Sequence, residues 1–414
     1  MPAIATFKAA LAFAALAGIA MAQKQTSVVF GYLPTWQADK AEAIDLSKYT
    51  HITIAFAAPD EDGRIAADNQ TEAAVKEWVG KINDAGARAL VSLGGWAGSK
   101  HMSPVMKSKV KRDRLIDDMV QWVRAYSLDG WDVDFEYPGR QGNTCHPFDA
   151  ASDTPNFQQF LADLRQRLDE DGDGDKGRAK LVTLATRFQP FDGPQGPLAD
   201  VSGFAPLVDY FNIMLYDFNG VWSSTTGPNA PLDHAQGKGL QASVRSSVQS
   251  WIDAGIPESK INAGLAFYGR TVTSSSSSSS DETDDGNNNG EKSMYLPLQK
   301  AIPRGDSDDL EESDPSCGGP KAFSGIWKYS NLRSEGVLDA PDSASSPWVR
   351  RFDKDTSTPW LYNTETKDFV SYDDPQSIGA KTQFAVSRGL AGVMVWPITN
   401  DYEGELISAI TEFI

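Results

Sequence analysis

Acidic side chains recur at every second position in one short apolar stretch of the sequence. Residues 129–138 read DGWDVDFEYP. Because alternate side chains of an extended strand share a face, Asp132, Asp134 and Glu136 would lie on one side, roughly 6–7 Å apart per two residues. Like charges this close and shielded from water raise the pKa of at least one carboxyl group. A carboxyl group that keeps its proton near neutral pH can act as a general acid.

The opposite face of this stretch is apolar. Trp131, Val133 and Phe135 occupy it, and Gly130 precedes them. This favours a buried strand, with a solvated acidic edge or a calcium-binding cluster as the alternatives. By the same parity Asp129 faces away from the other acids, so we expect it to have a structural role.

Eight short apolar runs, rich in β-branched and aromatic residues, are spread along the chain. Between them, stretches such as 75–82, 115–123 and 244–252 place apolar residues at helical spacing. This alternation indicates parallel strands, and eight units favour a closed (β/α)8 TIM barrel, with a doubly wound open sheet as the alternative. The expected strands centre near Val29, Thr53, Val91, Val133, Thr183, Ile213, Leu265 and Met394.

The spacing of these centres locates an insertion. Consecutive centres are 24 to 52 residues apart, except that Met394 follows Leu265 by 129 residues. We therefore expect a small α+β insertion domain between strands seven and eight, at 271–372. Its acidic, low-complexity start, at about 273–314, predicts a mobile surface loop. Active sites of such barrels lie at the carboxyl ends of the strands, so the insertion should form one wall of the cleft.

Composition limits the fold and the partners. A chain of 414 residues with 40% hydrophobic content suffices for one barrel, at 23–270 and 373–414, with its inserted lobe. Residues 1–22 have the pattern of a signal peptide, so we expect a secreted, extracellular protein. A net charge of −18 speaks against nucleic acid or anionic membranes as partners. No later segment reaches about 20 apolar residues, so no membrane span is expected, and nothing suggests more than a monomer.

Cys145 and Cys317 are the only cysteines of the chain. In an oxidising compartment such a pair is expected to be bridged, which would join the loop after strand four to the insertion. The four histidines lack the spacing of metal ligands, so neither a metal nor another cofactor is expected. The sequon at Asn69 offers an acceptor for glycosylation.

Several of these stretches resemble one known family. The acidic strand is similar to the DxxDxDxE signature of family 18 glycoside hydrolases, the chitinases, with Glu136 in the last position. Further stretches resemble motifs of that family in the same order: SLGGW at 92–96, MLYD at 214–217, FYGR at 267–270 and GVMVW at 392–396. The insertion is typical of the chitinase branch with a deep groove. Phe135 departs from the Trp common in the family.

The resemblance implies roles for individual residues. Glu136 would protonate the glycosidic oxygen and then act as the base for water, while the N-acetyl group of the substrate supplies the nucleophile. Asp134 would accept a hydrogen bond from the acetamide N–H, and Asp132 would share a proton with Asp134. Tyr216 would hold the acetamide oxygen, and Asp217 would contact the distorted sugar.

Sugar binding by this family uses aromatic rings, which bury the apolar faces of the sugars. Trp396 would form the floor beneath the sugar at the cleavage point. Further substrate-binding candidates are Trp96, Met214, Tyr137, Arg270, Tyr32, Phe56, Trp222 and Tyr268. For Tyr32, Phe56 and Trp222, ordinary core packing is the alternative.

The function implied is that of a secreted chitinase, which hydrolyses β-1,4 linkages of N-acetylglucosamine polymers with retention of configuration. Its partners would be chitin or chito-oligosaccharides. The alternatives are a non-catalytic chitinase-like sugar-binding protein and an endo-β-N-acetylglucosaminidase. The presence of Glu136, Asp134 and Tyr216 favours an enzyme over the first, and the insertion with the Met-x-Tyr-Asp pattern favours a chitinase over the second.

Overall fold

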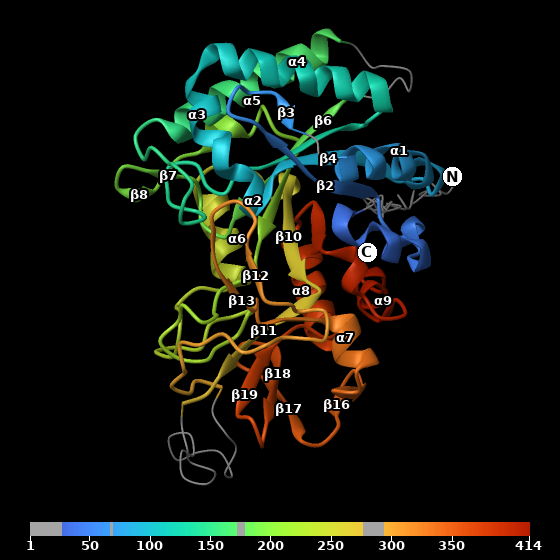
Figure 1. The fold of residues 1–414 in the computed structure, drawn as a ribbon, viewed down its shortest axis with the longest axis vertical. Coiled ribbons are helices and arrows are strands. Elements are labelled where there is room, and N and C mark those ends of the chain that lie inside the picture. Colours follow the sequence, from blue (N-terminus) through green and yellow to red (C-terminus); the bar gives the residue numbers. More distant parts are fainter. Residues whose placement is uncertain (1–26, 67–68, 172–178, 276–293) are drawn as a thin grey trace, which may run out of the picture.

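Eight parallel strands form a closed barrel in the computed structural model, which describes residues 27–66, 69–171, 179–275 and 294–414 (Figure 1). The barrel closes because β1 pairs with both β20 and β2. Its strands are β1 (Val28–Pro34), β2 (His51–Pro59), β4 (Arg88–Gly94), β5 (Gly130–Asp134), β6 (Leu181–Arg187), β9 (Tyr210–Met214), β10 (Ile261–Ala266) and β20 (Gly392–Trp396). Each of the eight predicted centres lies within one of these strands, so the TIM barrel is confirmed and the open sheet is wrong.

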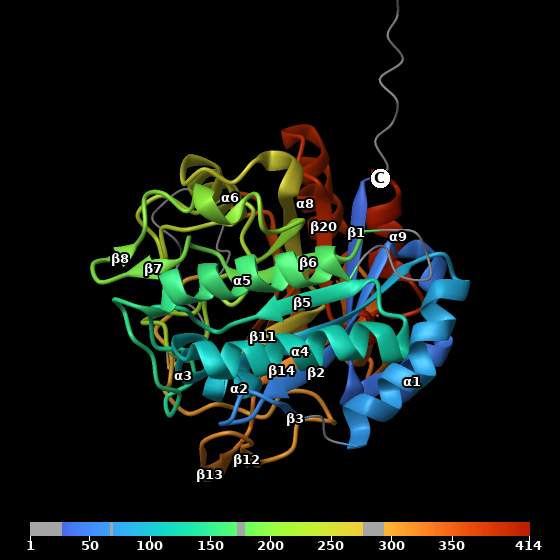
Figure 2. The ribbon, with the colours of Figure 1, turned by 90° about the horizontal axis from the view of Figure 1, so that it is seen from above.

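Helices cover the outside of the barrel, as Figure 2 shows for α1, α4 and α5. The covering helices are α1 (Asn69–Asp84), α4 (Lys109–Tyr126), α5 (Asp153–Glu170), α6 (Val244–Asp253), α8 (Pro375–Arg388) and α9 (Glu405–Thr411). Shorter elements at the barrel mouth are β3 (Ile65–Ala66), α2 (Gly95–Gly98), α3 (Met102–Lys107), β7 (Asp192–Gly193) and β8 (Gly196–Pro197). Among the described residues, no helix combines the length and the apolar character that a membrane span requires.

The two faces of β5 differ as the sequence predicts. Trp131 and Val133 are fully buried among the outer helices, where the indole N–H of Trp131 donates to the Met119 carbonyl of α4. The acids Asp132 and Asp134 face the barrel interior and its mouth. Asp129 has the expected structural role, because its carboxylate accepts a 2.9 Å hydrogen bond from the Ala89 amide of β4.

An antiparallel sheet lies between β10 and β20 in the sequence. Its strand order is β14-β11-β19-β18-β17, and in Figure 1 it forms the end of the molecule opposite α4. The elements of this region are β11 (Tyr268–Thr273), β12 (Glu312–Asp314), β13 (Gly318–Ala322), β14 (Ile326–Lys328), α7 (Tyr329–Ser334), β15 (Leu338–Ala340), β16 (Ser343–Ala344), β17 (Trp348–Asp353), β18 (Thr358–Asn363) and β19 (Asp368–Ser371). The strands β12 and β13 pair as a separate hairpin.

The described residues cover only part of the predicted mobile loop at about 273–314. Residues 276–293, like the predicted signal peptide at 1–22, lie outside the described residues. At 294–296 the chain packs against the sheet, because Met294 and Leu296 are buried with Trp360 and Phe369. The prediction of a loop at about 273–314 was based on the net charge of the whole segment and did not consider the apolar residues at 294–296, which attach the chain to the sheet.

Candidate active site

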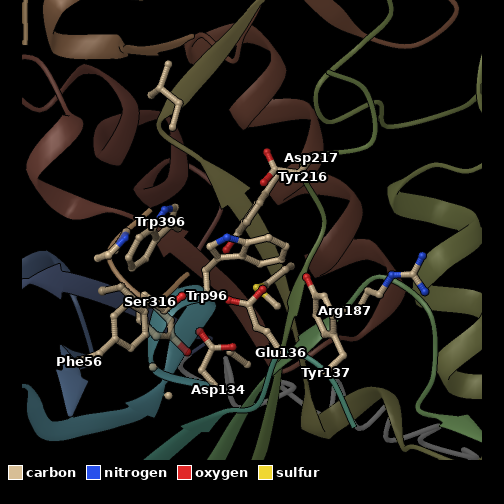
Figure 3. Close-up of a pocket in the computed structure, with 18 of the residues that line it drawn as sticks. Phe56, Trp96, Asp134, Glu136, Tyr137, Arg187, Tyr216, Asp217, Ser316 and Trp396 are labelled. Atoms are coloured by element: carbon tan, nitrogen blue, oxygen red, sulfur yellow. The ribbon is translucent and has the colours of Figure 1, made fainter. Parts of the chain in front are cut away.

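A cleft of about 1800 Å³ opens at the carboxyl ends of the barrel strands. It is lined by residues from the loops after most barrel strands and by residues of the insertion, among them Glu312 and Ser316. Of the residues predicted to act on substrate, all but Asp132 line this cleft. Figure 3 shows Glu136 and Tyr137 facing Tyr216 and Asp217 across it, with Phe56 and Trp396 to one side.

Asp132 lies beneath the cleft, fully buried inside the barrel. Its carboxylate accepts hydrogen bonds from four side chains of four other strands. The donors are Tyr32 at 2.9 Å, Ser92 at 2.7 Å, Thr183 at 2.6 Å and Asn212 at 3.5 Å. Burial raises the pKa of Asp132, while these donors act in the opposite direction. This shell therefore fixes the Asp132 carboxylate and supports a negative charge in the barrel interior.

Asp134 is the next acid along the same face, and its surroundings differ. Its side chain is buried, and its Oδ1 atom has no hydrogen-bond partner among the described residues. Burial, followed by the charges of Glu136 and Asp132, raises the pKa of Asp134 well above its ordinary value. Asp134 is thus a buried carboxyl group with a raised pKa and an oxygen without a hydrogen-bond partner at the cleft floor.

Glu136 follows β5 at the point where the chain enters the cleft. Its backbone amide donates a 2.9 Å hydrogen bond to the Ser99 hydroxyl, which holds the residue against the neighbouring loop. Burial raises the pKa of Glu136 to about 7, an effect that the Tyr137 hydroxyl opposes and the Asp217 charge reinforces. A carboxyl group with this pKa carries its proton under mildly acidic conditions and can donate it to a substrate oxygen.

Tyr216 and Asp217 lie on the wall of the cleft that follows β9. Burial and the nearby acids raise the pKa of Tyr216 well above its ordinary value, so its hydroxyl remains a donor. Asp217 is held by Arg270, whose Nε and Nη2 donate to its two oxygens at 2.5 and 2.6 Å, and by the Tyr268 hydroxyl at 2.6 Å. Arg270 in turn lies 5.0 Å from the ring centroid of Trp222.

Aromatic rings surround Trp396 at the other side of the cleft. Its ring centroid is 5.7 Å from that of Phe56, 5.8 Å from that of Tyr32 and 6.4 Å from that of Trp36. Trp96 and Trp222 are 48% and 57% exposed, so core packing does not explain Trp222. Tyr32 is 2% exposed and directs its hydroxyl to Asp132, so its ring belongs to the floor beneath the cleft.

Several cleft residues were missed in the sequence, among them Trp36 and Arg187. Trp36 lies in the 3-10 helix Thr35–Ala43 directly after β1, is 53% exposed and lines the cleft. Its position just beyond the carboxyl end of a predicted strand was an available signal. Arg187 ends β6 and lines the cleft next to Phe188. In Figure 3 its guanidinium points away from Glu136.

The predicted disulfide is present. Cys145 and Cys317 are bonded, with their Cα atoms 5.5 Å apart. In the described part of the chain, these cysteines and His146 form one group of metal-ligand residue types. The two sulfur atoms are bonded to each other, so this group offers no thiolate ligand.

The comparisons with known proteins agree with this geometry. The chain belongs to glycosyl hydrolases family 18, whose sequence profile it matches over residues 28–401. It is 32% identical to a chitinase-like effector of Moniliophthora roreri, over 93% of this chain and 92% of that protein. It is 28% identical to Chitinase A1 of Niallia circulans, over 90% of this chain and 56% of that protein.

Known structures of the family share the fold. A chitinase from Rhizomucor miehei superposes with a TM-score of 0.83 at 30% identity, over 93% of this chain and 99% of that one. A family 18 N-acetylglucosaminidase from Paenibacillus barengoltzii superposes with a TM-score of 0.74 at 25% identity, over 94% of this chain and 100% of that one. Family membership supports chitin hydrolysis as the activity of this fold.

Proposed function

We propose that this protein is a secreted chitinase that hydrolyses β-1,4 linkages of N-acetylglucosamine polymers by a retaining, substrate-assisted mechanism. The supporting observation is the carboxyl group of Glu136, which burial gives a pKa of about 7, at the surface of a cleft lined by aromatic rings. Trp396, Trp96 and Trp222 would bind sugar faces along this cleft, because their rings can bury the apolar side of a pyranose.

In the first step, Glu136 gives its proton to the glycosidic oxygen as the bond from that oxygen to the anomeric carbon breaks. The acetamide oxygen of the same sugar attacks the anomeric carbon from the other side and forms a cyclic oxazolinium ion. Asp134 turns its free oxygen to the acetamide N–H, which aligns the carbonyl oxygen for attack. Tyr216 donates to that oxygen, and Asp132 supplies the negative charge that stabilises the cation.

In the second step, Glu136 is a carboxylate and takes a proton from a water molecule. The water oxygen bonds to the anomeric carbon and reopens the ring, so the configuration is retained. Asp217, held by Arg270 and Tyr268, contacts the distorted sugar. The mechanism needs no second carboxylate nucleophile, because the substrate carries its own.

A second function is favoured by the names of two relatives. The chitinase-like effectors of Moniliophthora roreri and Moniliophthora perniciosa are 32% and 34% identical to this chain. A protein that binds chito-oligosaccharides without turnover would use the same aromatic cleft. The intact set of Glu136, Asp134 and Tyr216 favours the hydrolase.

The test compares the wild-type protein with Glu136→Gln on colloidal chitin and on the six-sugar oligomer. We expect reducing ends from the wild type, β-anomers among the first products, and no more than about a thousandth of that rate from the variant. Inverted products, or equal rates from both proteins, would refute the assigned acid. If the wild type binds the oligomer in a parallel calorimetric measurement but releases no product, it is the sugar-binding protein. If it cleaves a glycoprotein glycan supplied as a further substrate but not chitin, it is the endo-β-N-acetylglucosaminidase.

A further inference from the structure

The hairpin of β12 and β13 extends from the insertion toward α2 (Figure 1). Both arms are exposed, with every residue of β13 and the first two of β12 accessible to solvent. The hairpin nevertheless lines the cleft, through Glu312 at the start of β12 and through Pro315 and Ser316 at its tip. Because so little of the hairpin is buried, its own packing contributes little to holding it in this position.

The tip is held instead by groups on two barrel loops. Cys317 is bonded to Cys145 of the loop after β5. Beside this bond, the Asn143 amide donates to Asp314 at 2.7 Å and to the Ser316 hydroxyl at 3.1 Å. From the loop after β4, the Lys100 ammonium donates to the Ser316 carbonyl at 3.0 Å. The covalent bond is the one of these contacts that water cannot replace.

These two loops lie across the barrel mouth from the strand after which the insertion begins. The insertion leaves the barrel after β10, and the closed strand order places β4 on the opposite side of the barrel from β10. A segment that starts in the insertion and ends on the loops after β4 and β5 therefore reaches from one side of the mouth to the other. The cleft is therefore bounded by the barrel on one side and by the hairpin tip on another.

We propose that the hairpin of β12 and β13, tethered by Cys145 and Cys317, is a binding wall that makes the cleft select for long sugar chains. A long chain extends past Trp96 and contacts the wall, whereas a short one covers less of it. Without the bond, the exposed hairpin must be ordered each time a ligand binds. The conformational entropy lost in this ordering makes binding weaker. The identity of the ligand rests on the proposed function above.

The experiment measures the affinity for chitohexaose and chitobiose by calorimetry in a Glu136→Gln parent, which prevents turnover. We expect Cys145→Ser/Cys317→Ser in this parent to weaken hexaose binding about tenfold and biose binding by less than about twofold. The double substitution leaves no free thiol, because the chain has two cysteines. Thermal unfolding of each protein shows that binding is measured on folded material.

A second arm leaves the sequence of the parent unchanged. A water-soluble phosphine and one water molecule reduce the disulfide: the two sulfur atoms take the protons of the water and become thiols, and the phosphine takes its oxygen and becomes the phosphine oxide. The reduced parent should bind chitohexaose as weakly as the serine variant, and the serine variant itself should not respond to the phosphine. If the serine variant does not fold, this measurement alone tests whether the disulfide contributes to chitohexaose affinity.

The outcomes separate the two proposals. Equal hexaose affinity with and without the bond would overturn the binding wall while leaving the chitinase proposal intact. An equal loss for biose and hexaose would also overturn it, because the wall would then not select for length. A parent that binds neither sugar would refute the proposed function, and the binding wall with it.

Discussion

Asp132 and Asp134 lie two residues apart on the same face of β5, but they differ in how many hydrogen bonds their carboxyl groups accept. Asp132 accepts from four side chains, whereas the Oδ1 atom of Asp134 has no partner among the described residues. Hydrogen bonds hold the first carboxylate in place, and no hydrogen bond holds the Oδ1 atom of the second. In the mechanism proposed here, Asp132 keeps its place while Asp134 follows the substrate, and this difference in hydrogen bonding suits that division of roles.

Replacing the free member should affect turnover more than binding. We expect Asp134→Asn to lower kcat on a soluble chito-oligosaccharide about 100- to 1000-fold, with KM changed less than about fivefold, because its oxygen acts on the acetamide in the transition state. Asp129→Asn, directly before the same strand, is the matched control, and its kcat should stay within about twofold. A loss confined to KM would contradict the role of Asp134.

The pH dependence of kcat/KM follows from the free enzyme. Glu136 must be protonated to act as an acid, and its pKa is raised to about 7, so the rate should fall about tenfold per pH unit above neutrality. On the acid side, Asp132 and Asp134 must together keep a negative charge. Burial raises the pKa of both, so this limb should lie above the ordinary carboxyl range.

A fluorogenic chitobioside measured from pH 3 to pH 10 would check both limbs. The Glu136→Gln protein provides the background, since no alkaline limb should remain in its residual activity. A rate that stays constant up to pH 9 would show that Glu136 is not the acid. A rate that stays constant down to pH 3 would show that the Asp132 and Asp134 pair is not needed in its charged form.

The period of two along β5 was enough to predict which side of the strand carries the acids. The partners of Asp132 could not be predicted in this way, because Tyr32, Ser92, Thr183 and Asn212 meet only when the barrel closes. Likewise, the charge of the segment before Asp314 predicted a loop, although Met294 and Leu296, in the middle of that segment, pack against the sheet. The local sequence pattern predicted the strands and helices and which face of a strand is buried. Contacts between distant strands could be identified only from the folded structure.

The ion pair between Arg270 and Asp217 should position the sugar at the cleavage point. Arg270→Met removes two charge-assisted hydrogen bonds and the contact with Trp222, and we expect kcat/KM to fall about 10- to 100-fold. Arg270→Lys, which keeps the charge without the fork, should recover part of this loss. If the two residues act as a unit, Asp217→Asn should lower kcat/KM less in the Arg270→Met protein than it does in the wild type. If the two losses in kcat/KM are fully additive, the residues are not coupled.

Trp396 is expected to contribute through the face of its ring. Trp396→Ala should weaken chitohexaose binding to a Glu136→Gln parent about 10- to 100-fold, since the loss of one stacked aromatic face costs about 1–3 kcal/mol. Trp396→Phe, which keeps a smaller ring, should lose less. Calorimetry on the two variants would show this order, and equal affinity for all three proteins would exclude the ring from the binding site.

A buried ion pair outside the cleft should determine much of the stability of the last barrel unit. The Lys381 ammonium of α8 donates to Asp373, and both side chains are at most 1% exposed. Lys381→Met leaves the carboxylate buried without its counter-charge, which we expect to lower the free energy of unfolding by about 3–5 kcal/mol. The double variant Lys381→Met/Asp373→Leu should recover most of this loss, because neither charge remains to be desolvated. Lys109→Met breaks the exposed pair with Asp113 and should cost less than about 0.5 kcal/mol. Urea unfolding followed by tryptophan fluorescence would measure all three, and a single-variant loss below about 1 kcal/mol would show that water reaches Asp373.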